Sequence, residues 1–210
     1  EGNLKYTKEG AHSTNRILYH EDITGKEITS KLYAEVKTRK NITIEEYVTL
    51  TDLLVKNGKC VGGRVRKGDE EHDIYANFVV LATGGIGGVH REAETTMDIS
   101  ADLTEMTHTN VAVISAGVKS ILDIGLTLEY METMGIPVVT FGQDEFPSFY
   151  SGKSGYLSPL RLNTADEIAA MLAVKWRLGL NGSVLIANPL PPEQEVAPEL
   201  IEVYIQQALK

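Results

Sequence analysis

The chain has 210 residues, 42% of them hydrophobic, so it can build one large or two small packed domains and is not globally disordered. The acidic and basic residues of 1–82 balance, so the net charge of −9 comes from residues 83–210. This excess of negative charge disfavours nucleic-acid binding. No apolar run approaches the ~20 residues that a membrane-spanning helix needs. The single cysteine, Cys60, excludes an internal disulfide and, with no visible signal peptide, predicts a cytoplasmic protein.

Residues 1–82 predict a helix followed by a small antiparallel β-meander. Apolar residues recur at helical spacing over 25–39, and residues 41–47 are β-rich. Asn57-Gly58 is a strong hairpin signal within the meander. Further strands are expected at 48–55, 61–66, 72–76 and 78–82. Turn signals favour a polar loop, rather than a metal or catalytic cluster, at His12, Arg16 and His20.

Residues 83–210 alternate strands with helices, which predicts an α/β fold with a mainly parallel sheet covered on both faces. Thr164-Ala-Asp-Glu167 is a capping-box pattern that opens one of the helices. The strands are expected at 111–115, 137–141 and 183–188, and the helices at 119–134, 164–176 and 198–209. We therefore expect two parts, residues 1–82 and residues 83–210.

A glycine-rich stretch, Phe78–Arg91, joins the two parts. It begins as an apolar run that predicts a buried strand and continues into two glycine pairs, Gly84-Gly85 and Gly87-Gly88. Glycines after a strand let backbone N–H groups approach a phosphate closely. The alternative is a tight turn without a ligand. The stretch also departs from the dinucleotide-binding fingerprint, because His90 stands where the third glycine belongs.

Candidate catalytic groups follow this stretch. Asp98, Ser100 and Asp102 could hold a divalent cation and a phosphate, and the alternative is a helix N-cap. Lys119 follows an apolar strand and a glycine at the start of a predicted helix. At that place a lysine amine can attack a carbonyl carbon, whereas the alternative is a solvated lysine.

Three segments, Glu9–Ile28, Asn41–Val55 and Val80–Gly85, carry a specific resemblance over roughly residues 5–88. They resemble L-aspartate oxidase, a flavoprotein of the succinate dehydrogenase/fumarate reductase group. The resemblance implies that Ala82, Thr83, Gly84 and Gly85 lie beside the adenosine part of FAD. The Gly-x-Gly-x-x-Gly turn that seats the FAD pyrophosphate is absent from this sequence.

A nearly continuous resemblance covers residues 83–210. It is carried by Thr83–Arg91, Asp98–Leu103, Ala116–Asp123, Leu128–Thr133, Gly179–Gly182 and Ala187–Pro189. These segments resemble pseudouridine-5′-phosphate glycosidase. The resemblance implies that Lys119 forms an imine with C1′ of the ring-opened ribose and that Asp98 binds Mn²⁺ or another divalent cation. It further implies substrate contacts at Ser100, Ala101 and Asp102 and phosphate contacts at Thr83, Gly84, Gly85 and His90.

Some residues of the glycosidase pattern have no counterpart here. No segment of residues 1–82 matches the general-acid Glu or the phosphate-binding Lys of the glycosidase family. The family's C-terminal region, which supplies a substrate-binding Asn, would lie beyond Lys210. Glu92 replaces the usual Gly and adds negative charge beside the expected phosphate site. We therefore interpret the chain as a hybrid joined at the shared Thr-Gly-Gly string, with each part incomplete.

The first hypothesis is impaired cleavage of pseudouridine 5′-phosphate to uracil and ribose 5-phosphate. The second is a flavin-dependent oxidase. The third is a non-catalytic α/β domain that binds a sugar phosphate. We expect a homo-oligomer, because lost flanking segments leave apolar faces uncovered.

Overall fold

The computed structural model describes residues 6–7, 17–18, 30, 33–57 and 59–208. The chain divides into two compact units, Glu1–Thr49 and Leu50–Lys210. In the first unit, strand β1 (Tyr6–Thr7) pairs antiparallel with β2 (Ile17–Leu18), and residues 33–38 are helical within the predicted helix. His12, Arg16 and His20 lie outside the described residues.

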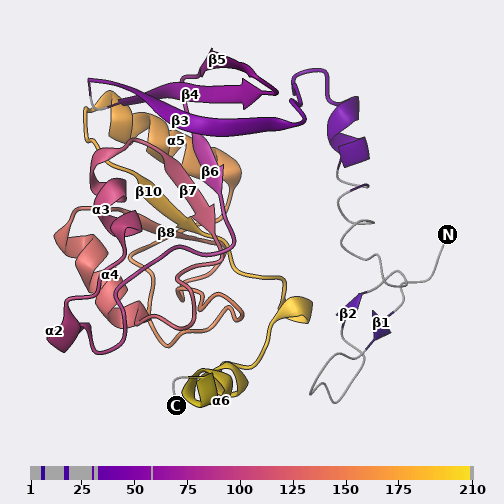
Figure 1. Ribbon diagram of the computed structural model, residues 1–210. Coiled ribbons are helices and arrows are strands. Elements are labelled where there is room, and N and C mark those ends of the chain that lie inside the picture. The colour runs from indigo at the N-terminus through magenta and orange to yellow at the C-terminus, as the bar shows by residue number, and fades with distance from the viewer. Residues whose placement is uncertain (1–5, 8–16, 19–29, 31–32, 58, 209–210) are drawn as a thin grey trace. The chain divides into compact units, whose positions relative to one another are not determined.

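The predicted β-meander is confirmed. Strands β3 (Val48–Lys56), β4 (Lys59–Lys67) and β5 (Glu70–Tyr75) form a three-stranded sheet in that order (Figure 1). Asn57 has a φ of 54°, as the predicted turn after β3 requires. Cys60 on β4 is buried and joins the main hydrophobic core, against which Leu53 of β3 also packs. This sheet is therefore part of the same packed body as the strands that follow.

A second sheet of five parallel strands, in the order β6-β7-β10-β8-β9, confirms the predicted α/β fold (Figure 1). Its order places the apolar strands β7, β10 and β8 in the middle, where both faces are covered. The strands are β6 (Val80–Ala82), β7 (Ala112–Ser115), β8 (Val138–Phe141), β9 (Leu160–Leu162) and β10 (Val184–Ala187).

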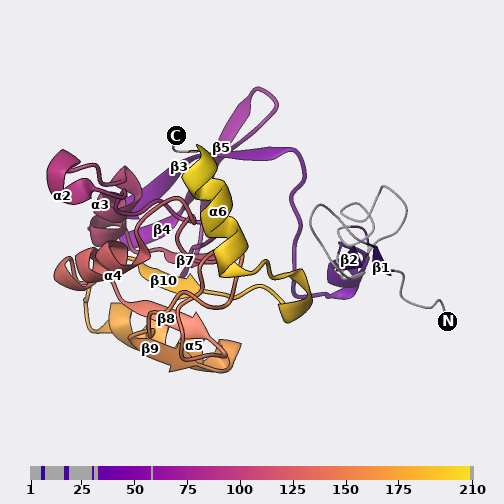
Figure 2. The same ribbon diagram turned by 90° about the horizontal axis from the view of Figure 1, so that it is seen from below.

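Helices cover both faces of this sheet. On one face, Val113, Val138 and Leu185 pack with residues of α3 (Ala101–His108) and α4 (Ile124–Thr133). On the other face, Val139 and Ile186 pack against α5 (Ala165–Arg177) through Leu172 and Trp176. The view from below shows α5 on the opposite side of the sheet from α3 (Figure 2). The remaining helices are α2 (Ala93–Thr96), η1 (Pro192–Gln194) and α6 (Pro198–Ala208).

Several predicted elements differ from the structure. The strand expected to be buried at 78–82 is the short edge strand β6, which pairs only with β7 among the described strands and is exposed along its length. Residues 41–47 form no strand. The helix expected from residue 119 begins at Ile124, because Asp123 accepts a hydrogen bond from Leu126 N at 2.8 Å and caps it there. Helices α2 and α3 and strand β9 were not predicted.

The domain boundary at residue 82 and the self-association of the chain stay predictions. In the part of the chain that the structure describes, no helix has the length and apolar character needed to cross a bilayer.

The capping box predicted at the start of α5 is confirmed. Thr164 Oγ1 accepts a hydrogen bond from Glu167 N at 3.2 Å, and Glu167 Oε2 accepts from Thr164 N at 2.9 Å. Glu167 Oε2 also accepts from Asn163 N at 2.8 Å. These backbone donors lower the pKa of the Glu167 carboxyl. The box fixes the start of the helix that covers one whole face of the sheet.

Replacing Thr164 with Ala should therefore lower the free energy of unfolding by about 1 kcal/mol, because one backbone N–H at the start of α5 loses its acceptor. Urea unfolding followed by circular dichroism measures this loss. The matched control is Thr104→Ala on α3, an exposed threonine inside a helix. Equal losses in the two variants would contradict the capping role.

Candidate active site

The glycine-rich loop continues the pairing of β6 with β7 beyond the ends of both strands. Thr83 N donates to Ile114 O at 3.0 Å, and Ile86 N donates to Gly117 O at 3.1 Å. Lys119 N then donates to Ile86 O at 3.1 Å. These bonds follow directly from the β6–β7 register. They place Lys119 beside the middle of the loop.

The other side of the loop faces the start of α3. Asp102 Oδ2 accepts a hydrogen bond from Gly87 N at 2.8 Å, and Ser100 N donates to Gly88 O at 3.0 Å. Ser100 is the N-cap of α3, since its hydroxyl accepts from Asp102 N at 3.2 Å. The helix-cap interpretation of this cluster is therefore correct for Ser100. Asp102, in the first turn, turns its carboxylate toward the loop.

Close packing explains why most of these positions are glycine. A Cβ atom at Gly87 would lie 2.6 Å from Ser100 Cβ and 2.9 Å from Asp102 Oδ2. At Gly88 it would lie 2.9 Å from Val118 Cγ1. At Gly84, in contrast, the nearest atoms are 3.9 Å away, an ordinary contact distance. Gly84 is thus the one glycine of the two pairs that packing leaves free.

Two amides of the loop are available to a ligand. Among the described residues, the N–H groups of Gly84 and Gly85 donate no hydrogen bond. Gly84 is exposed and Gly85 half-buried. A pair of adjacent free N–H groups after a strand can bind an anion such as a phosphate.

A cleft of about 420 Å³ gathers half of the predicted site residues. Lys119 and Asp102 line it together with Ala82, Thr83 and Gly85. The rest of its wall is mainly apolar and comes from Leu53, Leu81, Ile86, Met106, Val111 and Val113. An amine, a carboxylate, a hydroxyl and glycine N–H groups therefore share one partly apolar hollow, as small-molecule sites commonly do.

The cleft contains one acidic residue that the sequence analysis did not single out. Glu105 lines it, and its carboxylate accepts a hydrogen bond from the Thr109 hydroxyl. Glu105 lies one helical turn after Asp102 on α3, and residues three apart share a helix face. That spacing is the sequence signal that could have identified it.

His90, Asp98, Ser100 and Ala101 do not line this cleft. His90 Nδ1 lies 3.6 Å from Asp98 Oδ2, and both side chains are exposed to solvent. The described residues contain no group of three or more His, Cys, Asp or Glu side chains able to hold a metal ion. The expectation that Asp98 binds Mn²⁺ therefore has no support in the described residues.

The residues present do not complete an FAD site either. Ala82, Thr83 and Gly84 are exposed at the end of the edge strand β6. The sequence contains no Gly-x-Gly-x-x-Gly turn to hold the pyrophosphate. We therefore derive no chemical step through either group.

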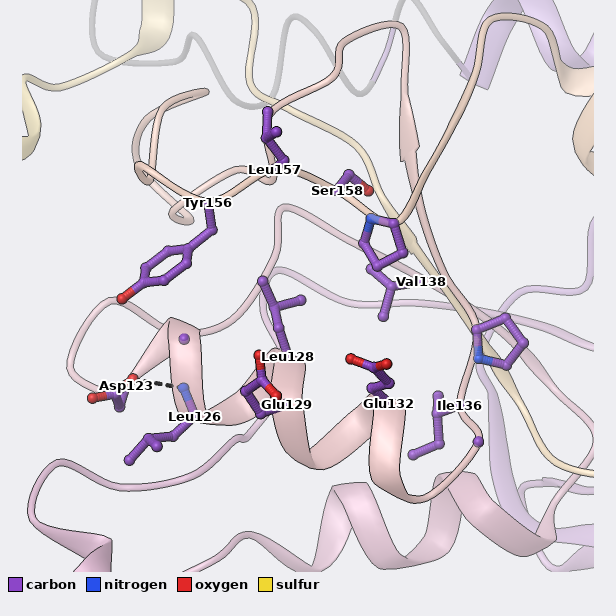
Figure 3. A pocket seen from close by; sticks show the side chains of 14 residues that line it. Asp123, Leu126, Leu128, Glu129, Glu132, Ile136, Val138, Tyr156, Leu157 and Ser158 are labelled. Carbon is purple, nitrogen blue, oxygen red and sulfur yellow. Dashed lines mark hydrogen bonds between the residues drawn. The ribbon is translucent and has the colours of Figure 1, made fainter.

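A second hollow, larger than this cleft, is less suited to a phosphate. The hollow in Figure 3 has a volume of about 920 Å³ and lies between α4 and residues 156–159. Asp123, Glu129 and Glu132 line it, and none of its lining residues is Lys, Arg or His. This carboxylate-rich wall repels anions.

Arg91 fixes the turn that follows Lys119. Its guanidinium donates to Ser120 O at 3.4 Å and to Ile121 O at 3.2 Å. It also donates two hydrogen bonds of 2.8 Å to the Glu202 carboxylate on α6. This bidentate pair lowers the pKa of Glu202 from 4.5 to about 2. Arg91 thus ties the Lys119 turn to α6.

Comparison with protein families agrees with the two resemblances. The family model for indigoidine synthase A like proteins matches residues 74–210, and that for the FAD binding domain matches residues 1–134. Each match covers more than half of the chain. The chain belongs to both families. The matches overlap across the glycine-rich loop, so the hybrid interpretation is confirmed.

Curated relatives fall into the same two groups. The pseudouridine-5′-phosphate glycosidase of Deinococcus radiodurans is 60% identical over 79 residues, which is 38% of this chain and 25% of that protein. The glycosidase of Nocardioides sp. is 58% identical over 79 residues, 38% of this chain and 26% of that protein. The L-aspartate oxidase of Clostridium perfringens is 47% identical over 87 residues, 41% of this chain and 20% of that protein. The chain therefore spans about a quarter or less of each.

Two solved structures are similar to the α/β part. An indigoidine synthase A-like protein from Thermotoga maritima has a TM-score of 0.57 and 38% identity, over 61% of this chain and 43% of that one. The prealnumycin C-glycosynthase in complex with ribulose 5-phosphate has a TM-score of 0.60 and 37% identity, over 62% of this chain and 43% of that one.

The packing of the loop predicts different outcomes for its glycines. Gly87→Ala should lower the free energy of unfolding by about 1–3 kcal/mol, because the new methyl group overlaps Ser100 and Asp102. Gly84→Ala is the matched control, since its methyl group meets no atom closer than 3.9 Å. Urea unfolding measures both variants. A Gly87 variant as stable as the Gly84 variant would show that the loop does not press against α3.

The Arg91–Glu202 pair predicts a pH-dependent stability. Because the folded-state pKa of Glu202 lies below 4.5, the pair stabilises the fold fully above that pH and loses its effect as the pH falls to about 2. Wild type should therefore be more stable than Glu202→Gln above pH 4.5, and the difference should shrink near pH 2. Glu199→Gln, also on α6, serves as the control. A wild-type advantage that is the same at both pH values would contradict this pairing.

Proposed function

We propose that residues 83–210 carry the imine-forming chemistry of a C-glycosidase that acts on pseudouridine 5′-phosphate, with Lys119 as the nucleophile. The observation that carries the proposal is the cleft in which Lys119 shares a wall with Asp102, Thr83 and Gly85. The glycosidase relatives and the C-glycosynthase structure with ribulose 5-phosphate support it. The relatives are named for pseudouridine 5′-phosphate, in which a carbon–carbon bond joins the base to the sugar. The C-glycosynthase is named for the same kind of bond and is bound to a sugar phosphate.

In the cleavage direction, the Lys119 amine attacks C1′ of the ribose, and the bond from C1′ to the ring oxygen breaks as that oxygen takes a proton. The nitrogen lone pair then forms the C=N bond in the same step that expels the uracil ring. The bond from C1′ to C5 of the uracil ring breaks, its electron pair stays on C5, and C5 takes a proton. Water finally hydrolyses the imine to ribose 5-phosphate and returns the free lysine.

The other cleft residues and the adjoining Gly84 have supporting roles in this proposal. The free N–H groups of Gly84 and Gly85 and the Thr83 hydroxyl would bind the phosphate. Asp102, held by Gly87 N, would accept hydrogen bonds from ribose hydroxyls. The general-acid Glu of the glycosidase pattern has no counterpart, and the loss of a general acid costs on the order of 10²–10⁴ in rate. We therefore propose weak turnover but retained imine formation.

Flavin binding is the second candidate, and the match of residues 1–134 to the FAD binding domain family favours it. It ranks below the first because the pyrophosphate-binding turn is missing. Fluorescence titration of free FAD with the protein tests it. Unchanged flavin emission at saturating protein would exclude it.

Borohydride trapping tests the first proposal. Ribose 5-phosphate in its open-chain form condenses with a lysine amine to an imine and water, and borohydride reduces the imine to a stable secondary amine. Intact mass and peptide mapping should find one adduct, on Lys119. Lys119→Ala should abolish it, because no other lysine lines the cleft.

The control is Lys153→Ala, which removes an exposed lysine outside the cleft and should leave the adduct unchanged. Adducts scattered over many lysines, or a full yield in Lys119→Ala, would refute the assignment of the nucleophile.

A further inference from the structure

Phe149 has a backbone conformation that its residue type rarely adopts. Its φ is 66°, in the left-handed region, which is strained for a bulky side chain. Hydrogen bonds on both sides hold it there. Phe149 N donates to Ala116 O at 3.1 Å, Ser148 N donates to Ser151 O at 2.8 Å, and Ser120 Oγ donates to Ser148 O at 3.1 Å. Two of these partners flank Lys119 in sequence.

The conformation places the Phe149 ring on the glycine loop, next to Lys119. A Cβ atom built at Gly85 would lie 2.5 Å from Phe149 Cδ2 and 3.3 Å from Lys119 Cγ. The ring and the aliphatic stem of Lys119 therefore both lie close to the same glycine. The ring of Tyr150 supports that of Phe149 edge-on, with ring centroids 4.5 Å apart and an interplanar angle of 88°.

We propose that Phe149 is a positioning residue for Lys119, a role that rests on the proposed function. A lysine side chain has a flexible stem of four carbons, so on an open surface it samples many rotamers. The ring forms an apolar wall along the stem, and Gly85 leaves room for both. The wall confines the stem so that the amine stays at the cleft. Misplacement of a reacting group by about 1 Å can cost 10²-fold in rate.

The experiment compares the rate of borohydride-trapped imine formation at saturating ribose 5-phosphate with the Kd of ribose 5-phosphate. Phe149→Leu keeps an apolar side chain but removes the ring. It should lower the trapping rate about tenfold to a hundredfold, with the Kd unchanged. Phe149→Tyr keeps the ring and should restore the wild-type rate. Tyr204→Leu, which removes an exposed ring on α6, is the matched control and should behave as wild type.

Two results would overturn the inference. One is an unchanged trapping rate in Phe149→Leu. The other is a rate and an affinity that fall together in both Phe149 variants, which would indicate a purely structural role. Thermal unfolding of each variant checks that it remains folded.

A failure of the proposed function is separable from a failure of this inference. If wild type forms no adduct, the proposed function fails. Acylation of Lys119 by a small amine-reactive reagent such as acetic anhydride, which releases acetate, then tests the position of the ring beside the lysine. Peptide mapping should show faster labelling of Lys119 in Phe149→Leu than in wild type, with Lys153 unchanged. Equal labelling of Lys119 in the two proteins would overturn the inference.

Discussion

The candidate site depends on the close passage of one glycine-rich segment between two others. Residues 83–90 follow the edge strand β6 and run between the N-terminal end of α3 and the turn that contains Lys119. Main-chain hydrogen bonds on both sides hold the segment in register with β7. A side chain at Gly85, Gly87 or Gly88 would overlap Phe149, Ser100 or Thr127, respectively. The same packing that requires glycine also brings Asp102 and Lys119 to one cleft.

The hydrogen bonds that build the candidate site all lie within one part of the hybrid chain. They join residues 83–119 to one another, and the face of the sheet beneath is filled by α3 and α4. Arg91 also connects the turn that contains Lys119 to α6 through hydrogen bonds to Ile121 O and the Glu202 carboxylate. The two families overlap across this loop, so a junction at the shared Thr-Gly-Gly string leaves these contacts intact.

The sequence predicted the α/β fold, the meander and the α5 capping box because each has a local signal: hydrophobic period, a turn dipeptide or a cap residue. It was wrong about β6, because an apolar run does not reveal whether a strand has one neighbour or two. The sequence also placed the start of α4 too early, at Lys119. In the structure, β-bridges from Ile86 to Val118 and from Val89 to Asp123 outweigh the local helix propensity there. Glu105 was missed although its spacing from Asp102 is a local signal, whereas Phe149 was missed because its role arises from long-range contacts.

The measurement that tests the central claim most directly is a titration of the ¹⁵N-labelled protein with ribose 5-phosphate, followed by amide NMR. The account holds that the free N–H groups of Gly84 and Gly85 bind the phosphate at the edge of the cleft that Gly85 and Lys119 line. It predicts that the amides of Gly84 and Gly85 show the largest shifts, and that Lys119→Ala leaves these shifts in place. Shifts concentrated elsewhere, with Gly84 and Gly85 unmoved, would contradict it.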